Sequence, residues 1–112
     1  MRRGDLYLAD LGEPVGHEQA LQRPVLIVSA DPWLLSNPPV IAVLPLTRTH
    51  RSRSTHVELE PGGSGLAAVS YVKCEDIRAI SPLRFQHRMG EADSVVMARV
   101  DLILSRLLAL SP

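Results

Sequence analysis

The fold expected for this chain is decided by residues 15–29, which read Val15-Gly16-His17-Glu18-Gln19-Ala20-Leu21-Gln22-Arg23-Pro24-Val25-Leu26-Ile27-Val28-Ser29. Pro24 lacks an N–H, so it suits the first residue of a strand or a sheet edge, and it pushes Arg23 towards an extended conformation. The apolar run from Pro24 to Ser29 is typical of a strand buried on both faces. We therefore expect a sheet to begin just after Arg23 and to hold the Arg23 guanidinium at its rim. A guanidinium is always charged and its planar set of donors suits the recognition of phosphate.

The rest of the chain predicts further short strands. Alternation or continuous apolar character indicates strands at residues 5–11, 40–46, 56–59, 67–74, 77–80 and about 84–88. Val57 and Leu59 are expected to face inwards. The sequence Pro61-Gly62-Gly63-Ser64-Gly65 is a strong turn signal, and no helix follows it as a phosphate cradle would require.

Two segments predict helices. Residues 31–36 are expected to form one helical turn, with Asp31 as the N-cap and Pro32 at the first helical position. Between Ser94 and Leu110 the period changes, and Asp93 is the expected N-cap. The apolar residues there recur at intervals of three and four: Val96, Val100, Ile103, Leu104, Leu107 and Leu108. Short strands followed by one amphipathic helix predict a mostly β, α+β fold, a small barrel of antiparallel strands.

Length and composition predict an ordinary globular domain. The 112 residues, 46% of them hydrophobic and 21% charged, suit one domain over residues 1–112. No apolar run approaches the roughly 20 residues of a membrane span. Residues 1–5 are not followed by the apolar core of a signal peptide. The single cysteine, Cys74, agrees with a reducing compartment, so we expect a cytoplasmic protein without a membrane association.

The charges balance overall but are unevenly distributed. Twelve basic and twelve acidic residues give no net charge. However, no acidic residue lies between Asp31 and Glu58, a region that contains Arg48, Arg51 and Arg53, with His50 and His56 beside them. This region is either a solvated loop or a local phosphate-binding patch.

Several polar residues are candidates for chemistry. His17 and Glu18 lie in the expected loop. Glu18 pairs with Arg23 to fix that loop, or the same pairing orients Arg23 towards a phosphate; the two interpretations are compatible. Thr47 follows an apolar strand, where its hydroxyl either satisfies the next turn or contacts the same phosphate. Lys73 and Glu75 are two positions apart on an expected strand, so they would face the same side as a pair.

Other kinds of site are not expected. Cys74 has neither a second cysteine nor a histidine at zinc spacing, so we predict no metal site. The chain also lacks a Walker loop, a dinucleotide fingerprint and a nucleophile elbow, so no cofactor is predicted.

The motif Gly16-His17-Glu18-Gln19, followed by Arg23-Pro24-Val25-Leu26-Ile27-Val28, resembles the signature of the MazF/PemK (Kid) toxins of bacterial toxin–antitoxin systems. The opening Arg3-Gly4-Asp5-Leu6-Tyr7 and the segment from Ser70 to Ile80 are also similar to that family, in the same order. The resemblance covers nearly the whole chain. It implies an SH3-like barrel of the CcdB/PemK type, a homodimer, and inhibition by a cognate antitoxin.

The same resemblance implies an endoribonuclease that cuts single-stranded mRNA in a sequence-specific, metal-independent way and so arrests translation and growth. Arg23 and Thr47 match the catalytic arginine and threonine of the MazF branch. His17, Lys73 and Glu75 fall where the Kid/PemK branch has His, Arg and Asp, and these two exchanges leave the acid and base assignments open. The residues assigned to catalysis are Arg23, Thr47, His17, Glu18, Glu75 and Lys73. Those assigned to RNA binding are Arg48, His50, Arg51, Arg53, Gln19 and Arg78.

Without a metal site, the expected nucleophile is the ribose 2′-hydroxyl, with Arg23 stabilising the phosphoryl charge. His17 or Glu75 would be the base, and Lys73 or His17 the acid. Two alternatives stay open. One is a non-enzymatic toxin that binds a protein such as DNA gyrase, as CcdB does on the same barrel. The other is an RNA-binding barrel with idle catalytic positions.

Overall fold

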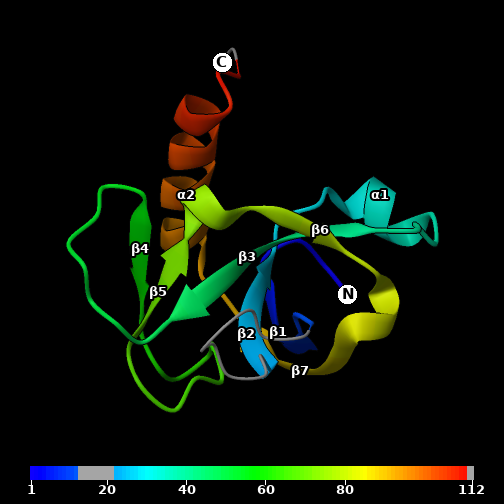
Figure 1. Cartoon of the computed structure of the whole chain (residues 1–112), viewed down its shortest axis with the longest axis horizontal. Coiled ribbons are helices and arrows are strands. Elements are labelled where there is room, and N and C mark those ends of the chain that lie inside the picture. The colour runs from blue at the N-terminus through cyan, green and yellow to red at the C-terminus, as the bar shows by residue number, and fades with distance from the viewer. Residues whose placement is uncertain (13–21, 111–112) are drawn as a thin grey trace.

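The structure, a computed structural model, describes residues 1–12 and 22–110 as seven strands, two α-helices and two 3-10 turns (Figure 1). The strands are β1 (Asp5–Asp10), β2 (Gln22–Ile27), β3 (Ile41–Thr47), β4 (His56–Leu59), β5 (Ser70–Lys73), β6 (Arg78–Ile80) and β7 (Phe85–Glu91). The helices are α1 (Asp31–Leu35) and α2 (Ser94–Leu107), and the 3-10 turns are η1 (Cys74–Asp76) and η2 (Pro82–Arg84). No helix in these ranges is long and apolar enough to cross a membrane.

The strands form one antiparallel sheet in the order β4-β5-β3-β2-β1-β7, and β6 pairs with the first half of β3. On β3, Val43 to Pro45 pair with β2, whereas Leu46 and Thr47 pair with β5 on the opposite edge. The predicted fold class, mostly antiparallel β with a C-terminal helix, is confirmed.

The apolar part of β2, Val25 to Ile27, is buried on both faces, as its sequence predicts. Val25 and Ile27 pack in one hydrophobic cluster, and Leu26 packs in the other, beneath α2. The strand begins at Gln22, two residues before the predicted start, so Pro24 lies inside it and pairs with Leu8. Because the recorded pairing with β3 ends at Val25, the missing N–H of Pro24 removes no hydrogen bond on that side.

The loop after β4 joins the two ends of the sheet. The amide of Glu91 in β7 donates to the carbonyl of Gly63 at 3.0 Å. This contact requires glycine: a Cβ on Gly90 would lie 2.3 Å from the Gly63 oxygen, and a Cβ on Gly65 would lie 2.0 Å from the Met89 oxygen. The predicted turn at residues 61–65 is thus also the segment that closes the sheet into a barrel.

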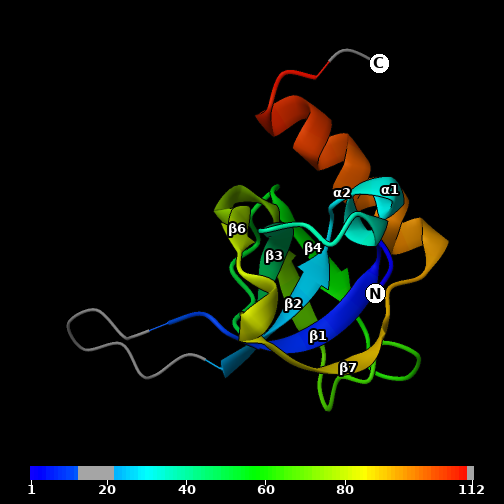
Figure 2. The same ribbon diagram turned by 90° about the vertical axis from the view of Figure 1, so that its right-hand side faces the viewer.

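Helix α2 packs one face on the sheet and extends beyond it (Figures 1 and 2). Asp93 caps the helix as predicted, accepting the Val96 amide at 2.8 Å, and the buried residues are Val96, Val100 and Leu104. The last two residues of the apolar repeat, Leu107 and Leu108, are 43% and 48% exposed. They are exposed because the last turn of the helix passes the edge of the sheet.

Two local predictions are wrong. Asp31 is not an N-cap: it is the first residue of α1, and its carboxylate accepts the Arg3 amide at 2.8 Å instead. The predicted strand at residues 67–74 spans only Ser70 to Lys73, because residues 67–68 bend as the chain leaves the closing loop. Cys74 then begins the 3-10 turn η1, so the alternation of a strand stops there.

Candidate active site

One polar face of the sheet collects several of the candidate residues. Thr47 of β3 pairs with Tyr71 of β5, and His56 of β4 pairs with Lys73. Directly opposed residues of antiparallel strands point to the same side of the sheet. The alternate row, Leu46, Val72 and Val57, is buried in the core. Thr47, Tyr71, Lys73 and His56 therefore share the outer face of strands β3, β5 and β4.

Arg23 lies at the same end of the sheet as Thr47. It is exposed on β2, where it pairs with Ala9 of β1. The last pair of the β2–β3 ladder is Val25 opposite Pro45. Arg23 lies two residues before Val25, and Thr47 lies two residues after Pro45. Because side chains alternate with a period of two, both residues continue this ladder on the side of its last pair. Arg23 and Thr47 thus mark the rim of the β2–β3 ladder.

Glu75 is anchored by two hydrogen bonds at the edge of this face. Its carboxylate accepts the Thr55 hydroxyl at 2.9 Å, and its other oxygen lies 2.9 Å from His56 Nε2. Partial burial acts to raise the pKa of Glu75, but the hydrogen bonds from His56, its own backbone amide and Thr55 outweigh burial and lower the pKa. An ionised carboxylate only accepts hydrogen bonds, so His56 Nε2 is the donor.

The predicted Lys73–Glu75 pair is wrong. Lys73 instead forms an ion pair with Asp76, with 2.7 Å between Nζ and the carboxylate. The physical reason is the 3-10 turn that begins at Cys74, which removes the period of two on which the prediction depended. Cys74 itself is buried, and burial, followed by the charge of Glu75, raises the pKa of its thiol to about 11. It is therefore an unreactive thiol rather than a nucleophile.

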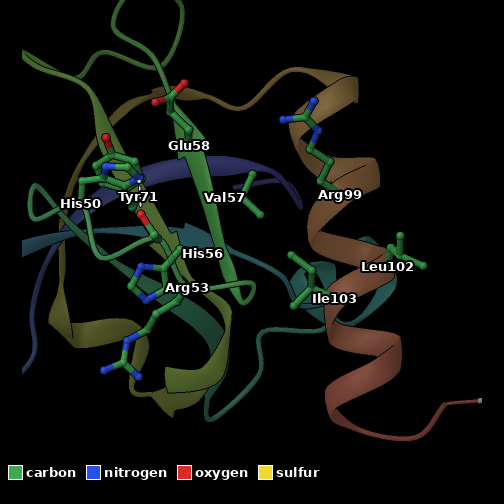
Figure 3. A pocket seen from close by; sticks show the side chains of 10 residues that line it. His50, Arg53, His56, Val57, Glu58, Tyr71, Arg99, Leu102 and Ile103 are labelled. Atoms are coloured by element: carbon green, nitrogen blue, oxygen red, sulfur yellow. Dashed lines mark hydrogen bonds between the residues drawn. The ribbon is translucent and has the colours of Figure 1, made fainter.

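The arginine-rich segment forms an exposed loop between β3 and β4. Arg48, Arg51 and Arg53 are all exposed there. The His50 ring stacks on Tyr71, with ring centroids 4.9 Å apart and an interplanar angle of 16°. A pocket of about 370 Å³ opens beside this stack, between the loop, β4 and α2 (Figure 3). The structure thus places aromatic surface and cations next to the face that carries Thr47.

The remaining candidates lie near the end of β1 or outside the described residues. Arg78 pairs with Val43 and donates to the Leu11 carbonyl at 3.3 Å, so it supports the end of β1 rather than the face of Thr47. His17, Glu18 and Gln19, and with them the expected Glu18–Arg23 pair, lie outside the described residues. Within residues 1–12 and 22–110, no group of three or more His, Cys, Asp and Glu residues could hold a metal ion.

Reasoning from the sequence did not assign His56 or Tyr71 to a site. The alternation His56-Val57-Glu58-Leu59, with Val57 and Leu59 predicted to face inwards, already put His56 on the polar face. Tyr71 follows from the same rule, since it precedes the buried Val72. What the sequence lacked was the pairing of β5 with both β3 and β4, which brings these two side chains beside Thr47 and Lys73.

Comparison with known proteins identifies the family. Residues 2–108 match the family described as PemK-like, MazF-like toxin of type II toxin–antitoxin system. The chain belongs to this family. Its curated relatives include endoribonuclease EndoA of Bacillus subtilis, which is 33% identical over 98% of the chain and 96% of that protein. Endoribonuclease MazF of Staphylococcus saprophyticus is 34% identical over 90% of the chain and 85% of its own length.

Solved structures of PemK/MazF-like toxins have the same fold. An endoribonuclease of a mycobacterial species, solved with its cognate antitoxin, superposes with a TM-score of 0.80 at 25% identity, covering 100% of this chain and 98% of that one. A MazE–MazF complex from Deinococcus radiodurans gives a TM-score of 0.80 at 25% identity, covering 99% of this chain and 97% of that one. The antiparallel sheet and closing helix described above are therefore those of this family.

Proposed function

We propose that this PemK/MazF-like toxin, acting as a single domain over residues 1–112, is a sequence-specific, metal-independent endoribonuclease that cuts single-stranded mRNA and so arrests translation. The observation that carries the proposal is the rim of the β2–β3 ladder, where Arg23, the second residue of β2, and Thr47, the last residue of β3, lie beside an arginine-rich loop. The endoribonuclease relatives support it, and nothing comparable favours a gyrase poison.

The reaction follows from the groups at this rim. The ribose 2′-oxygen attacks the neighbouring phosphorus and forms a 2′,3′-cyclic phosphate while the bond to the 5′-oxygen breaks. Arg23 stabilises the charge that gathers on the phosphoryl oxygens, because its guanidinium is permanently charged and donates two parallel hydrogen bonds. Thr47 is half-buried, and its hydroxyl also accepts the Thr49 amide at 3.2 Å, which leaves its proton available for the phosphate.

The proton transfers require a base for the 2′-hydroxyl and an acid for the departing 5′-oxygen. The lowered pKa of Glu75, and the use of both its oxygens by Thr55 and His56, make it a weak base. We therefore assign the base to His17 and the acid to Lys73, which lies on the same face as Thr47. Glu75 becomes a positioning residue that holds His56. Glu18, beside His17 in the sequence, orients Arg23.

RNA binding involves the loop between β3 and β4 together with flanking polar residues. Arg48, Arg51 and Arg53 neutralise backbone phosphates, and His50, stacked on Tyr71, offers a flat surface to an unstacked base. Gln19, which precedes β2 in the sequence, reads a base edge. Arg78 has a supporting part, because its hydrogen bond to the Leu11 carbonyl holds the chain just after β1.

The functional toxin is a homodimer inhibited by a cognate antitoxin. The exposed side chains of Leu108 and Leu110, at the free end of α2, provide apolar surface for a second copy. Two of the solved relatives were determined with their antitoxin, which supports a protein inhibitor of this chain as well. Light scattering of the purified chain tests the dimer: a species of monomer mass at micromolar concentration would contradict it.

The activity is tested with Arg23→Ala and, as a matched control, Arg106→Ala, which removes an exposed arginine from the far end of α2. Arg23→Ala should reduce cleavage of labelled mRNA by about a hundredfold or more, while the control cuts at the parental rate. Sequencing the ends of the cut RNA gives the recognition sequence. Cleavage by Arg23→Ala at the parental rate, or gyrase inhibition without RNA cleavage, would refute the proposal.

A further inference from the structure

The pocket beside the arginine-rich loop holds two opposite charges that do not pair with each other. This pocket, of about 370 Å³, opens between α2 and β4, which is the last strand in the order of the sheet (Figure 3). Glu58 of β4 and Arg99 of α2 both line it, and both side chains are exposed. Within residues 1–12 and 22–110, neither side chain forms an ion pair. The carboxylate and the guanidinium are therefore both available to a ligand in the pocket.

A flat aromatic surface forms a third wall of the pocket. The His50 ring stacks on Tyr71, with 4.9 Å between the ring centroids and an interplanar angle of 16°. Tyr71 is directly opposed to Glu58 in the β4–β5 ladder, so the two side chains lie next to each other on the same side of the sheet. A planar ligand stacked on these rings would therefore present one edge to Glu58 and another edge to Arg99 (Figure 3).

These three walls suit a nucleobase better than a phosphate. Proteins hold unstacked RNA bases by stacking them on aromatic side chains. A phosphate would be repelled by the Glu58 carboxylate, which only accepts hydrogen bonds and needs donors opposite it. The Arg99 guanidinium only donates, so it needs acceptors. The ligand that fits is thus a flat group with donors along one edge and acceptors along another.

Among the RNA bases, guanine has this arrangement of donors and acceptors. Its N1–H and its exocyclic amino group are two parallel donors for the two oxygens of Glu58. Its O6 and N7 are two acceptors for Arg99, in the commonest specific contact between arginine and a base. Adenine has an unprotonated N1 and uracil has a carbonyl on each side of its N3–H, so both would direct lone pairs at the carboxylate. Cytosine offers one amino donor, and its acceptors lie on that same edge.

We propose that this pocket is a guanine-binding subsite, in which the base stacks on His50 and Tyr71, donates to Glu58 and accepts from Arg99. The proposal rests on the proposed endoribonuclease function and makes guanine part of its recognition sequence. Tyr71 is directly opposed to Thr47 as well as to Glu58, so β4 lies two strand spacings, about 10 Å, from β3. The guanine therefore belongs to a nucleotide close to the scissile phosphate.

The subsite is tested with two analogues of guanine in single-stranded RNA. The RNA contains the recognition sequence, found by sequencing the ends of cut RNA, and a 2′-deoxyribose immediately 5′ of the cut so that it is bound without being cleaved. Inosine lacks the amino donor that faces Glu58, and 7-deazaguanine lacks the N7 acceptor that faces Arg99. Each analogue should weaken binding to the parent chain by about tenfold, because one hydrogen bond to a charged group is lost.

Variants of the protein assign each edge of the base to its residue. Glu58→Ala should bind the inosine and guanine RNAs equally, while 7-deazaguanine still weakens binding by about tenfold. Arg99→Ala should show the reverse pattern. The matched controls are Glu60→Ala and Arg106→Ala, which remove an exposed carboxylate just after β4 and an exposed guanidinium in the last turn of α2. Both controls should keep the full response to the two analogues.

Two results would overturn the proposal. One is a recognition sequence without guanine close to the cut. The other is a loss of affinity for inosine and 7-deazaguanine that is the same in Glu58→Ala and Arg99→Ala as in the parent, which would place the guanine elsewhere on the protein.

A second measurement is independent of cleavage. Guanosine 5′-monophosphate, titrated into the nitrogen-15-labelled chain, should shift the Arg99 Nε signal at concentrations about tenfold lower than the adenosine, cytidine or uridine monophosphates do. Binding of this nucleotide to a chain that cuts no RNA would refute the proposed function alone. RNA cleavage by a chain that binds the four nucleotides equally would refute the guanine subsite alone.

Discussion

Replacement of Glu75 by glutamine tests the hydrogen bonds that anchor the edge of the candidate site. Both of its oxygens are engaged at 2.9 Å, one with the Thr55 hydroxyl and one with His56 Nε2. A hydrogen bond to a charged group contributes about 1.5–3 kcal/mol and one between neutral groups about 0.5–1.5 kcal/mol. Exchanging a charged for a neutral acceptor therefore costs about 1 kcal/mol per bond. Because the side chain is 26% exposed, we expect Glu75→Gln to lower the free energy of unfolding by about 1–2 kcal/mol at neutral pH.

The effect of Glu75→Gln should depend on pH in a definite direction. The folded-state pKa of Glu75 is lowered from 4.5, so the carboxylate stabilises the fold above that pH and loses its contribution as the pH falls through the folded-state pKa. Urea unfolding of both proteins over a pH series should thus give a full difference at neutral pH that shrinks towards zero in acid.

The matched control for this experiment is Glu58→Gln. Glu58 is an exposed carboxylate on the same sheet without a hydrogen bond or ion pair among the described residues, and its replacement should change stability by less than about 0.5 kcal/mol. The reasoning would be refuted if Glu75→Gln were as stable as the parent at neutral pH, or if the difference were the same in acid.

Three further outcomes are expected. Thr47→Val should lower the rate of RNA cleavage by about a hundredfold, whereas Thr49→Val, in the exposed loop two residues on, should change it by less than about threefold; similar rates for the two variants would exclude Thr47 from catalysis. An RNA with one 2′-deoxyribose immediately 5′ of the cut should bind without being cleaved, whereas its cleavage would indicate a water nucleophile. EDTA should not slow the cleavage of ordinary RNA. Gly90→Ala should lower the free energy of unfolding by about 2 kcal/mol or more, because the added Cβ would overlap the Gly63 oxygen. In the control Gly63→Ala the added Cβ meets nothing within 4 Å, so this variant should be nearly neutral in thermal unfolding; equal melting temperatures of the two variants would refute the closure of the barrel at this point.

The local elements were largely determined by the sequence. The run Val25 to Ile27 predicted a strand buried on both faces, and the Asp93 cap with its apolar repeat predicted α2. These predictions succeed because hydrophobic periodicity and capping act between residues that are close in sequence. They fail where a distant segment competes: Asp31 accepts the Arg3 amide rather than capping α1.

The candidate site was determined only in part by the sequence. The sequence named Arg23, Thr47, Lys73 and Glu75 but paired the last two wrongly, because it did not show that the chain turns into a 3-10 helix at Cys74.

Only the tertiary structure placed His56 on Glu75, stacked His50 on Tyr71 and left the edge of β4 open beside α2. Each of these arrangements depends on strand register and on the packing of α2. Register and packing are set by contacts between residues far apart in the chain, which no local pattern in the sequence encodes.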